Sequence, residues 1–452
     1  MEIDDSVFAG RRAVRPLSVI VVGAGIGGLA VGLCMQMTGH NVVILEKRKQ
    51  TTEVGAGIQL APNATRILRR FGVLDEVLKH SIALERNSLR RWGNDEELGF
   101  VTLFPDVEEH FGAPLLSVHR ADLLRILLDA AINCGCKILT DHEVVEVDQW
   151  SQPVSNIRIN VRSHGKETWM SADLILAADG MSSVVRRQMA TANGHADQLL
   201  SHGESAYRFI LPLERIQHDE LMMDLVGKNN GTRYIGPGGH IMAYPLRGNT
   251  LLNVVLVHQA DGEGLEKTSW TAKGDKQVIL GHYRGWCPTV QAMITYADGS
   301  GVLQTPMNTM PPLPTWVKGH IALAGDACHY MLPYVAQGAS NAIEDAGVLA
   351  TAFTCVDDIE LALETYQLIR KNRGEFIQSS ATNTGHTLHL PDGEEQRIRD
   401  KSIREASQGV GSNPDKWSDK QFREFVWRHD VMAETIEKLE PVKQGNGMNG
   451  HK

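Results

Sequence analysis

The chain has 452 residues, of which 42% are apolar and 22% are charged, an ordinary composition for a soluble globular protein. This length exceeds what one hydrophobic core usually supports, so we expect two closely packed domains. The net charge of −9 argues against nucleic acid and against an anionic membrane surface as partners. No apolar run is long enough to span a membrane, and residues 1–16 lack the apolar segment of a signal peptide, so we expect neither membrane attachment nor export.

Six cysteines are spread thinly along the chain, mostly in apolar surroundings. They do not form a disulfide framework for a chain of this length, so we expect a reducing, cytoplasmic location. Cys134 and Cys136 lack the C-x-x-C spacing of common zinc and redox pairs. His386 and His389 have H-x-x-H spacing without a carboxylate partner, and we expect them on a surface loop. The sequence therefore predicts no metal site.

The first predicted elements form a strand, a glycine-rich turn, a helix and a second strand. The strand over residues 17–22 leads into Gly-Ala-Gly-Ile-Gly-Gly at 23–28, and the strand over 41–45 ends at Glu46. This arrangement is typical of an adenine-dinucleotide site, in which the start of the helix offers N–H groups to the phosphates.

Each polar or glycine position of this motif has a physical role. Gly23 and Gly25 permit a tight turn and a close approach of the backbone to a pyrophosphate, and Gly28 lets the helix pack on the strand. Glu46 stands where a carboxylate can accept hydrogen bonds from ribose hydroxyls. The motif alone leaves open whether the nucleotide is NAD or FAD.

Apolar spacing and turn residues predict the later elements. We expect helices over residues 62–71, 121–133, 339–353, 359–379 and 415–439; strands near 144–147, 157–161, 173–177 and 321–324; antiparallel sheet over 205–260; and irregular or weakly stranded chain over 83–118. Parallel strands thus continue long after the first unit, so we expect a nucleotide domain interrupted by an inserted sheet domain. The Gly- and Asn-rich tail after Pro441 is expected to be disordered.

Two later motifs narrow the cofactor. The strand over 174–177 runs into Ala178-Asp179-Gly180, followed by Ser183 and Arg186, and the strand over 321–324 ends in Gly325-Asp326, before Gln337-Gly338-Ala339 opens a helix. Together with the first motif, these elements resemble the flavoprotein aromatic hydroxylases, the family of p-hydroxybenzoate and salicylate hydroxylases. The resemblance runs from about Ser18 to Phe376.

The resemblance implies an α/β fold: a Rossmann-like FAD-binding domain with an inserted antiparallel β-sheet substrate domain and C-terminal helices. On this basis we expect residues 17–80, 119–190 and 306–355 to form the FAD-binding domain. Residues 81–118 and 191–305 would form the substrate domain, residues 356–440 a helical region and residues 441–452 a disordered tail.

The resemblance also implies residues that contact FAD. Asp326 would accept from a ribityl hydroxyl, and the helix start at Gln337, Gly338 and Ala339 would stabilise negative charge on the reduced ring. Asp179 would serve both FAD and the nicotinamide donor, although Asp-Gly after a strand is also a common turn.

Further FAD contacts carry alternatives of their own. Arg120 would contact FAD from a helix start, unless it forms a surface ion pair with Asp122 or a neighbour. Val145 would pack on adenine, unless it is an ordinary core residue. Gly57 and Ile58 match the loop against which the isoalloxazine moves.

The implied chemistry is hydroxylation of a phenol. NADH or NADPH would reduce FAD, and dioxygen would then form a C4a-hydroperoxyflavin that transfers an oxygen atom to the aromatic ring. We expect a small phenolic substrate and no nucleophile or metal, and the resemblance allows for a homodimer. The protein would supply positioning, exclusion of water and activation of the phenol.

Candidate substrate residues lie in the expected sheet and in the loop over the flavin. Arg208 would pair with a carboxylate or phenolate, unless it forms a structural ion pair. His240 would deprotonate the ring hydroxyl, unless it is an ordinary turn histidine. Tyr244 belongs to the family segment under flavin and substrate; Tyr234 lies nearby in sequence, and Pro333 belongs to the loop.

The run over residues 331–345 looks most like that of the salicylate hydroxylases, which hydroxylate and decarboxylate at one carbon. Related enzymes hydroxylate phenolic secondary metabolites and polyketides, so this alternative stays open. An oxygen-independent flavin reductase or dehydrogenase is the alternative from another enzyme class, and a non-catalytic nucleotide-binding protein is a third.

Overall fold

The computed structural model describes residues 5, 8–50, 56–148, 157–226, 228–260, 272–299 and 301–446. One half is built on a six-stranded sheet whose strands come from distant parts of the chain. In spatial order they are β19 (Val317–Lys318), β20 (Ile321–Leu323), β12 (Leu174–Ala177), β1 (Ser18–Val22), β2 (Asn41–Glu46) and β8 (Lys137–Thr140). All neighbours pair in parallel except β19, which is antiparallel to β20.

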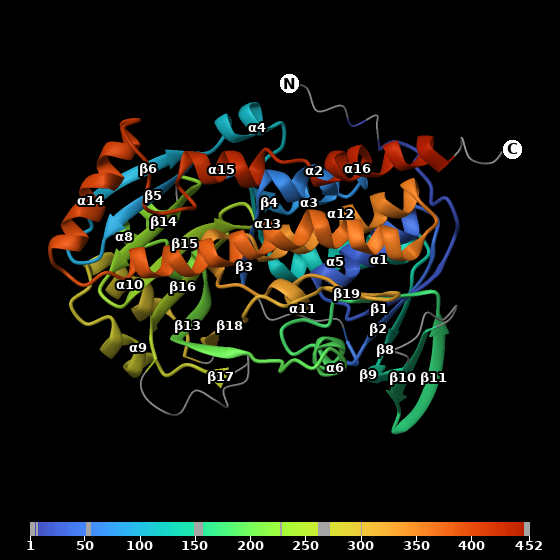
Figure 1. Ribbon diagram of the computed structural model, residues 1–452. Coiled ribbons are helices and arrows are strands. Elements are labelled where there is room, and N and C mark those ends of the chain that lie inside the picture. The colour runs from blue at the N-terminus through green and yellow to red at the C-terminus, as the bar shows by residue number, and fades with distance from the viewer. Residues whose placement is uncertain are drawn as a thin grey trace, which may run out of the picture.

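This sheet forms because its central strands are continuously apolar, as is typical of parallel strands covered on both faces. Val21 of β1 pairs with Ile44 on one side and Leu176 on the other, and all three are fully buried. Helix α1 (Ile26–Met37) packs closely on the sheet at Gly32. A Cβ at this position would lie only 2.5 Å from the Ile44 side chain, so the close packing requires glycine. Helices α1, α5 (Arg120–Asn133) and α12 (Gly338–Cys355) lie together in Figure 1.

Two small sheets flank this half. One is an antiparallel meander of β9 (Glu143–Val147), β10 (Ile157–Ser163) and β11 (Lys166–Ala172). The other joins β3 (Gly57–Leu60), β7 (Leu116–His119) and β4 (Ser81–Ile82).

The other half is an eight-stranded sheet. In spatial order its strands are β17 (Ala272–Lys273), β18 (Leu303–Thr309), β13 (Leu200–Pro212), β16 (Leu251–Gln259), β15 (Gly239–Leu246), β14 (Asn230–Gly236), β5 (Arg86–Arg91) and β6 (Glu97–Thr102). The expected antiparallel sheet over 205–260 is confirmed for β13, β16, β15 and β14, but residues 213–216 and 220–226 within this range are helical, and β14 also pairs with β5 in parallel. The expectation of irregular or weakly stranded chain over 83–118 is confirmed for the strands β5, β6 and most of β7, but it missed helix α4 (Asp106–Phe111).

The eight-stranded sheet buries both faces. Its outer face packs on α8 (Glu220–Val226), α9 (Lys276–His282) and α10 (Pro288–Tyr296), around residues such as Tyr207, Tyr234 and Val254. Its inner face packs on the first half through residues such as Met242, Tyr244 and Leu332. We use "inner face" below for this second side.

Helix α13 (Ile359–Leu388) connects the two halves. It is 30 residues long, begins beside the six-stranded sheet and ends against the inner face of the eight-stranded sheet, where His389 contacts His240 (Figure 1). The helix is longer than the expected 359–379. None of the helices in the described ranges is long and apolar enough to cross a membrane.

The remaining helices complete the covering of both halves. They are α2 (Pro62–Arg70), α3 (Leu74–Lys79), α6 (Val184–Ala192), α7 (Leu213–Ile216), α11 (Asp326–His329), the short 3-10 helix η3 (Pro333–Val335), α14 (Glu394–Ser407), α15 (Lys420–Trp427) and α16 (Val431–Asn446). The single helix expected over 415–439 is thus two helices. The disorder expected after Pro441 is wrong for residues 441–446, which continue α16.

Candidate active site

The glycine loop has the geometry of a phosphate cradle. A Cβ on Gly28 would lie 1.9 Å from the Gly23 carbonyl oxygen, and a Cβ on Gly23 would lie 2.6 Å from that of Ala178. Gly25, in contrast, caps α1, and no described atom would lie within 4 Å of a Cβ at this position. The start of α1 therefore has room for an anion.

Glu46 closes this loop from the end of β2. Its carboxylate accepts hydrogen bonds from the backbone N–H groups of Ala24 at 2.9 Å and Arg48 at 2.8 Å. Glu46 thus lies beside the glycine loop, as a ribose-binding acid must.

The three motifs meet around Ala342 and Ala178. A Cβ on Gly27 or on Gly325 would lie 3.3 Å from the Ala342 side chain of α12, and Gly23 contacts the backbone of Ala178 and Asp179. The glycine loop, the Asp-Gly turn, the Gly-Asp turn and the start of α12 are therefore neighbours in space.

Asp179 mainly stabilises the local fold where these motifs meet. Its carboxylate accepts from the Ser183 hydroxyl at 2.5 Å and from the Val184 N–H at 2.8 Å, which caps α6. Burial raises the pKa of Asp179, while these hydrogen bonds oppose the rise. Arg186 of the same helix pairs with Asp197 and donates to the Ala327 carbonyl, which ties α6 to the Gly-Asp turn.

The Gly-Asp turn presents Asp326 to solvent. Gly325 has φ +60 and donates its N–H to Asp345 at 2.8 Å, while Asp326, exposed, begins α11. An exposed carboxylate at this position fits the predicted contact with a ribityl hydroxyl.

The start of α12 is also open. Gln337 provides no side-chain cap, the first turn holds no acid, and Gly338 faces open space. The Nε2 group of Gln337 is buried and has no hydrogen-bond partner among the residues that the structure describes, although its Oε1 accepts from Asn63 at 3.1 Å. A buried donor without a partner is costly, so this amide fits a site that an FAD acceptor atom would complete. Ala339, half-buried, lies in the same turn.

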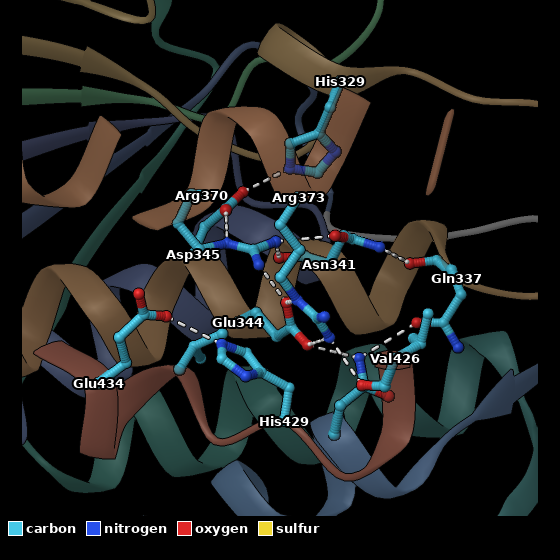
Figure 2. Close-up of polar contacts among 12 residues, drawn as sticks. His329, Gln337, Asn341, Glu344, Asp345, Arg370, Arg373, Val426, His429 and Glu434 are labelled. Atoms are coloured by element: carbon cyan, nitrogen blue, oxygen red, sulfur yellow. Dashed lines mark hydrogen bonds and ion pairs between the residues drawn. The ribbon is translucent and has the colours of Figure 1, made fainter. Parts of the chain in front are cut away.

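Behind this helix start lies a buried charge network (Figure 2). Glu344 pairs with Arg370 and Arg373, and Asp345 pairs with Arg370 at 2.8 Å and with His329 at 2.6 Å. Burial alone would raise the pKa of Glu344, but the two arginines lower it to about 2. Asn63 donates to Glu344 and to Gln337, so the network continues to the open helix start.

Cys328, His329 and Asp345 are close enough together to suggest a metal cluster. However, both oxygens of Asp345 already accept hydrogen bonds, one from Arg370 and the other from His329 and the Gly325 N–H. Burial also raises the pKa of the Cys328 thiol, which disfavours the thiolate that a metal needs. The cluster therefore fits a structural network better than a metal site.

The other predicted FAD residues lie around the same junction. Arg120 begins α5, is half-buried and donates its N–H to the Ala56 carbonyl at 2.9 Å. Asp122, its predicted alternative partner, pairs with Arg247. Ile58 is half-buried in β3, and Val145 is half-buried in β9.

Gly57 joins the two halves of the molecule. Its N–H donates to Asn253 Oδ1 at 2.6 Å, and a Cβ on Gly57 would lie 2.6 Å from the Tyr244 ring. The loop that is expected to meet the isoalloxazine therefore packs directly on the inner face.

Strand register decides which sheet candidates share the inner face. Arg208 lies opposite Val255, which lies opposite Met242, and His240 and Tyr244 flank Met242 at alternate positions of β15. Arg208, His240 and Tyr244 therefore share the inner face.

Tyr234 was predicted to belong to the substrate site, but it lies on the other face of the sheet. It lies opposite Ile241 and packs among the outer-face residues, with its hydroxyl buried. Because strand alternation turns it away from His240, we leave Tyr234 out of the candidate site.

Arg208 is a partly buried cation without a carboxylate partner. Its Nε lies 3.5 Å from the Thr305 hydroxyl, and within the described ranges it forms no ion pair. Burial lowers its pKa, and its closest electrostatic neighbours are Tyr244 and Tyr330. The alternative that Arg208 belongs to a structural ion pair is therefore not supported.

His240 is buried on the inner face and is not a turn histidine. Its Nδ1 lies 2.7 Å from Nε2 of His389, and burial, followed by His389 and Arg233, lowers the pKa of His240 well below its ordinary value. The expectation of a surface loop at residues 386–389 is wrong, because His386, although exposed, lies within α13, and the His389 side chain at the end of this helix is 8% exposed. The H-x-x-H spacing did not predict the contact between His389 and His240.

The loop over residues 331–335 faces the same region. Pro333 begins η3 and is exposed, while Leu332 and Tyr334 are buried against the inner face. The Tyr334 hydroxyl donates to Glu204 of β13, a residue that the sequence did not single out.

The nucleotide half, the open helix starts and the inner face together define an FAD-binding flavoprotein. The chain belongs to the family described as FAD binding domain, whose model matches residues 16–380. The predicted fold class and FAD cofactor are confirmed.

Relatives and solved structures agree with this assignment. The chain is 36% identical over 404 residues to the FAD-dependent monooxygenase atnJ of Arthrinium sp, covering 88% of this chain and 91% of that protein. It is 30% identical to 3-hydroxybenzoate 6-hydroxylase 1 of Aquipseudomonas alcaligenes, covering 81% and 87%. A salicylate hydroxylase substrate complex has the same fold, with a TM-score of 0.76 at 22% identity, covering 94% of this chain and 98% of that one. The chain is thus a flavin-dependent monooxygenase.

Proposed function

We propose that this enzyme hydroxylates a small phenol that carries an ortho carboxylate or carbonyl group, with NAD(P)H and dioxygen as co-substrates. The observation that carries the proposal is Arg208, a partly buried guanidinium on the inner face without a carboxylate partner among the described residues. An anionic group on the substrate would supply the missing partner.

His240 is proposed to accept the phenolic proton. Burial, His389 and the nearby cations Arg233 and Arg208 lower its pKa, so its imidazole is neutral and can accept a proton. Tyr244 lies on the same face but stays protonated, because burial raises its pKa and keeps its phenol group neutral. Pro333, at the exposed start of η3, would border the bound ring.

The FAD-binding residues are proposed from the open positions of the junction. Gly23, Gly25, Gly28 and the start of α1 would hold the pyrophosphate, Glu46 the ribose, and Asp326 the ribityl chain. Gln337, Gly338 and Ala339 would face the pyrimidine of the ring, with Gly57 and Ile58 on the loop opposite. Arg120, Val145 and Asp179 complete the proposed set. Bound FAD supplies the transfer of electrons from NAD(P)H and the activation of dioxygen.

Some relatives support a hydroxybenzoate-like substrate by their names, among them 3-hydroxybenzoate 6-hydroxylase and 3-amino-4-hydroxybenzoate 2-monooxygenase. The relatives at 36% and 32% identity are named only as FAD-dependent monooxygenases, which leaves a phenolic secondary metabolite or polyketide as the alternative.

All six cysteines are free thiols, which fits the proposed reducing cytoplasm.

The test uses purified, FAD-loaded enzyme with salicylate, 3-hydroxybenzoate and 3-amino-4-hydroxybenzoate. We expect salicylate, whose carboxylate is ortho to the hydroxyl, to accelerate NADH or NADPH oxidation and to yield a hydroxylated product in step with the NAD(P)H consumed. Turnover of only 3-hydroxybenzoate or 3-amino-4-hydroxybenzoate would contradict the ortho position, because their carboxylates are meta and para to the hydroxyl. Catechol from salicylate would identify the decarboxylative reaction. Acceleration with hydrogen peroxide as the only product from every phenol would contradict the proposal.

The same experiment under argon separates the alternative enzyme class. A hydroxylase reduces its flavin once and then stops without dioxygen. Continued turnover under argon would indicate a flavin reductase or dehydrogenase instead.

A further inference from the structure

A chain of hydrogen bonds leads from His240 to the surface. Nδ1 of His240 lies 2.7 Å from Nε2 of His389, and Nδ1 of His389 lies 2.7 Å from Oε1 of Glu204. The other oxygen of Glu204 accepts from the Tyr334 hydroxyl. His202 lies 3.4 Å from the same carboxylate, and its ring is near that of the exposed His386.

The fold holds this chain in place from three directions. Glu204 and Arg208 lie on the same face of β13, and an irregular register after Ser201, with Gly203 at φ +76, precedes Glu204. The His389 carbonyl accepts from the Gly238 N–H at the turn just before His240. The two imidazoles stack with ring centres 5.0 Å apart, and Tyr334 lies edge-on to both.

Glu204, at the end of this series of hydrogen bonds, determines which atom donates in each of them. Burial alone would raise the pKa of Glu204, but its interactions with His389, Tyr334 and His202 together lower it, so Glu204 is a carboxylate that only accepts. In the resting site a neutral His389 then carries its one proton on Nδ1, and its Nε2 accepts. His240 must donate from Nδ1, which leaves the Nε2 lone pair of His240 for a substrate.

We infer that Glu204 and His389 are positioning residues that make His240 a base, an inference that rests on the proposed phenol hydroxylation. The phenolic proton moves to Nε2 of His240 while the Nδ1 proton of His240 moves to Nε2 of His389. The phenol becomes a phenolate, His240 stays neutral, and His389 becomes an imidazolium paired with Glu204.

This transfer places positive charge where the protein can hold it. His240 faces His389, Arg233 and Arg208, and burial and these groups all disfavour a charge on it. His389 instead contacts the Glu204 carboxylate, and an ion pair stabilises the imidazolium. His202 and His386 lie beyond Glu204, on the path by which the proton would reach water.

Glu204→Gln gives the sharpest test, because it preserves shape and reverses polarity. With its oxygen held by Tyr334, the amide NH₂ would donate to Nδ1 of His389. His389 would then donate from Nε2 to His240, whose proton would move to Nε2, and the lone pair needed by the substrate would be lost. Tyr334→Phe is the matched control, because it removes a hydrogen bond to the same carboxylate but leaves the polarity unchanged.

The first measurement needs no substrate. NMR of FAD-loaded enzyme labelled with ¹⁵N-histidine, with signals assigned through His240→Gln and His389→Gln, reports which ring nitrogen carries the proton. We expect Nδ1 of His240 to be protonated in the wild type and in Tyr334→Phe, and Nε2 in Glu204→Gln. A His240 tautomer that is the same in the wild type and in Glu204→Gln would overturn the inference.

The second measurement is the pH profile of kcat with a phenol that the wild type hydroxylates. We expect Glu204→Gln and His389→Gln to lose about 10²-fold at pH 7, in line with the loss of general base catalysis. The deficit should shrink as the pH rises toward the pKa of the free phenol, whereas His164→Gln, at an exposed histidine, should match the wild type. A deficit that is constant across pH would mean a structural role only. If no phenol is hydroxylated, the proposed function fails, while the NMR result still decides the tautomers.

Discussion

Gly57 and Tyr244 meet where the nucleotide-binding half touches the inner face of the eight-stranded sheet. A Cβ on Gly57 would lie 2.6 Å from the Tyr244 ring and 2.8 Å from Asn253. Because Tyr244 is buried, the ring has no room to retreat. The approach of the two halves at this point therefore depends on a residue without a side chain.

Gly57→Ala should destabilise this contact by about 1–3 kcal/mol, the usual cost of overpacking a buried site. Thermal unfolding of the apoprotein measures the loss. In the double variant Gly57→Ala/Tyr244→Ala the cost of the added methyl group should largely disappear. Gly281→Ala is the control, because Gly281 has nothing within 4 Å. Equal costs of Gly57→Ala with and without Tyr244 would show that the ring does not set the limit.

The glycine loop predicts two different phenotypes. Gly28→Ala should destabilise the apoprotein, because its Cβ would lie 1.9 Å from a backbone oxygen of the same loop. Gly25→Ala should leave apoprotein stability unchanged, because the position faces open space, but should weaken FAD binding about tenfold, or about 1.4 kcal/mol. Unfolding of the apoprotein and titration with FAD separate the two effects. Normal FAD affinity in Gly25→Ala would argue that the pyrophosphate lies elsewhere.

Arg208 should determine the preference for an anionic substrate. Arg208→Gln should raise KM for a carboxylated phenol by about 10–100-fold, since a hydrogen bond to a charged group contributes about 1.5–3 kcal/mol. The KM of a phenol without a carboxylate should change little, and Arg284→Gln, at an exposed arginine, should change neither. A parallel loss for both kinds of phenol would assign Arg208 to packing instead.

Glu344 should make stability depend on pH in the acid range. Its pKa falls from an ordinary value of 4.5 to about 2 in the folded protein, so its contribution is complete above pH 4.5 and is lost as the pH falls through 2. Glu344→Gln should cost about 3–5 kcal/mol at pH 7, because it leaves buried arginines without a partner.

The difference between wild type and Glu344→Gln should therefore narrow between pH 4.5 and pH 2. Chemical unfolding of the FAD-loaded protein across this range measures it, with the exposed Glu394→Gln as the control. A difference that stays constant down to pH 2 would show that Glu344 is not held as a carboxylate by Arg370 and Arg373.

Local patterns in the sequence predicted the cofactor half. Gly23, Gly325 and Gln337 each stand at a strand end or a helix start, so neighbouring residues define their setting, and the FAD family and fold class follow from them. The limits of the domain segments and the roles of the single site residues stay predictions.

The inner face was harder to predict, because it depends on contacts between distant residues. Tyr234 and His240 are close in sequence, yet the β14–β15 register turns them to opposite faces. His389 reaches His240 across 149 residues, and no spacing rule encodes that contact. The pairing of β5 with β14 was missed for the same reason, since β5 gains its partner only in the folded sheet.

The length of helix α13 sets the spacing between the buried charge network and the inner face. Arg370 and Arg373 fix one part of it to the buried charge network behind the start of α12, and His389 at its end meets Glu204 and His240. Each residue of an α-helix turns by about 100°, so inserting or deleting one residue between Arg373 and His389 would swing His389 off its partners. Variation in chain length among relatives should therefore spare this helix, and any transplant of the substrate sheet onto another flavoprotein must carry α13 at its full length.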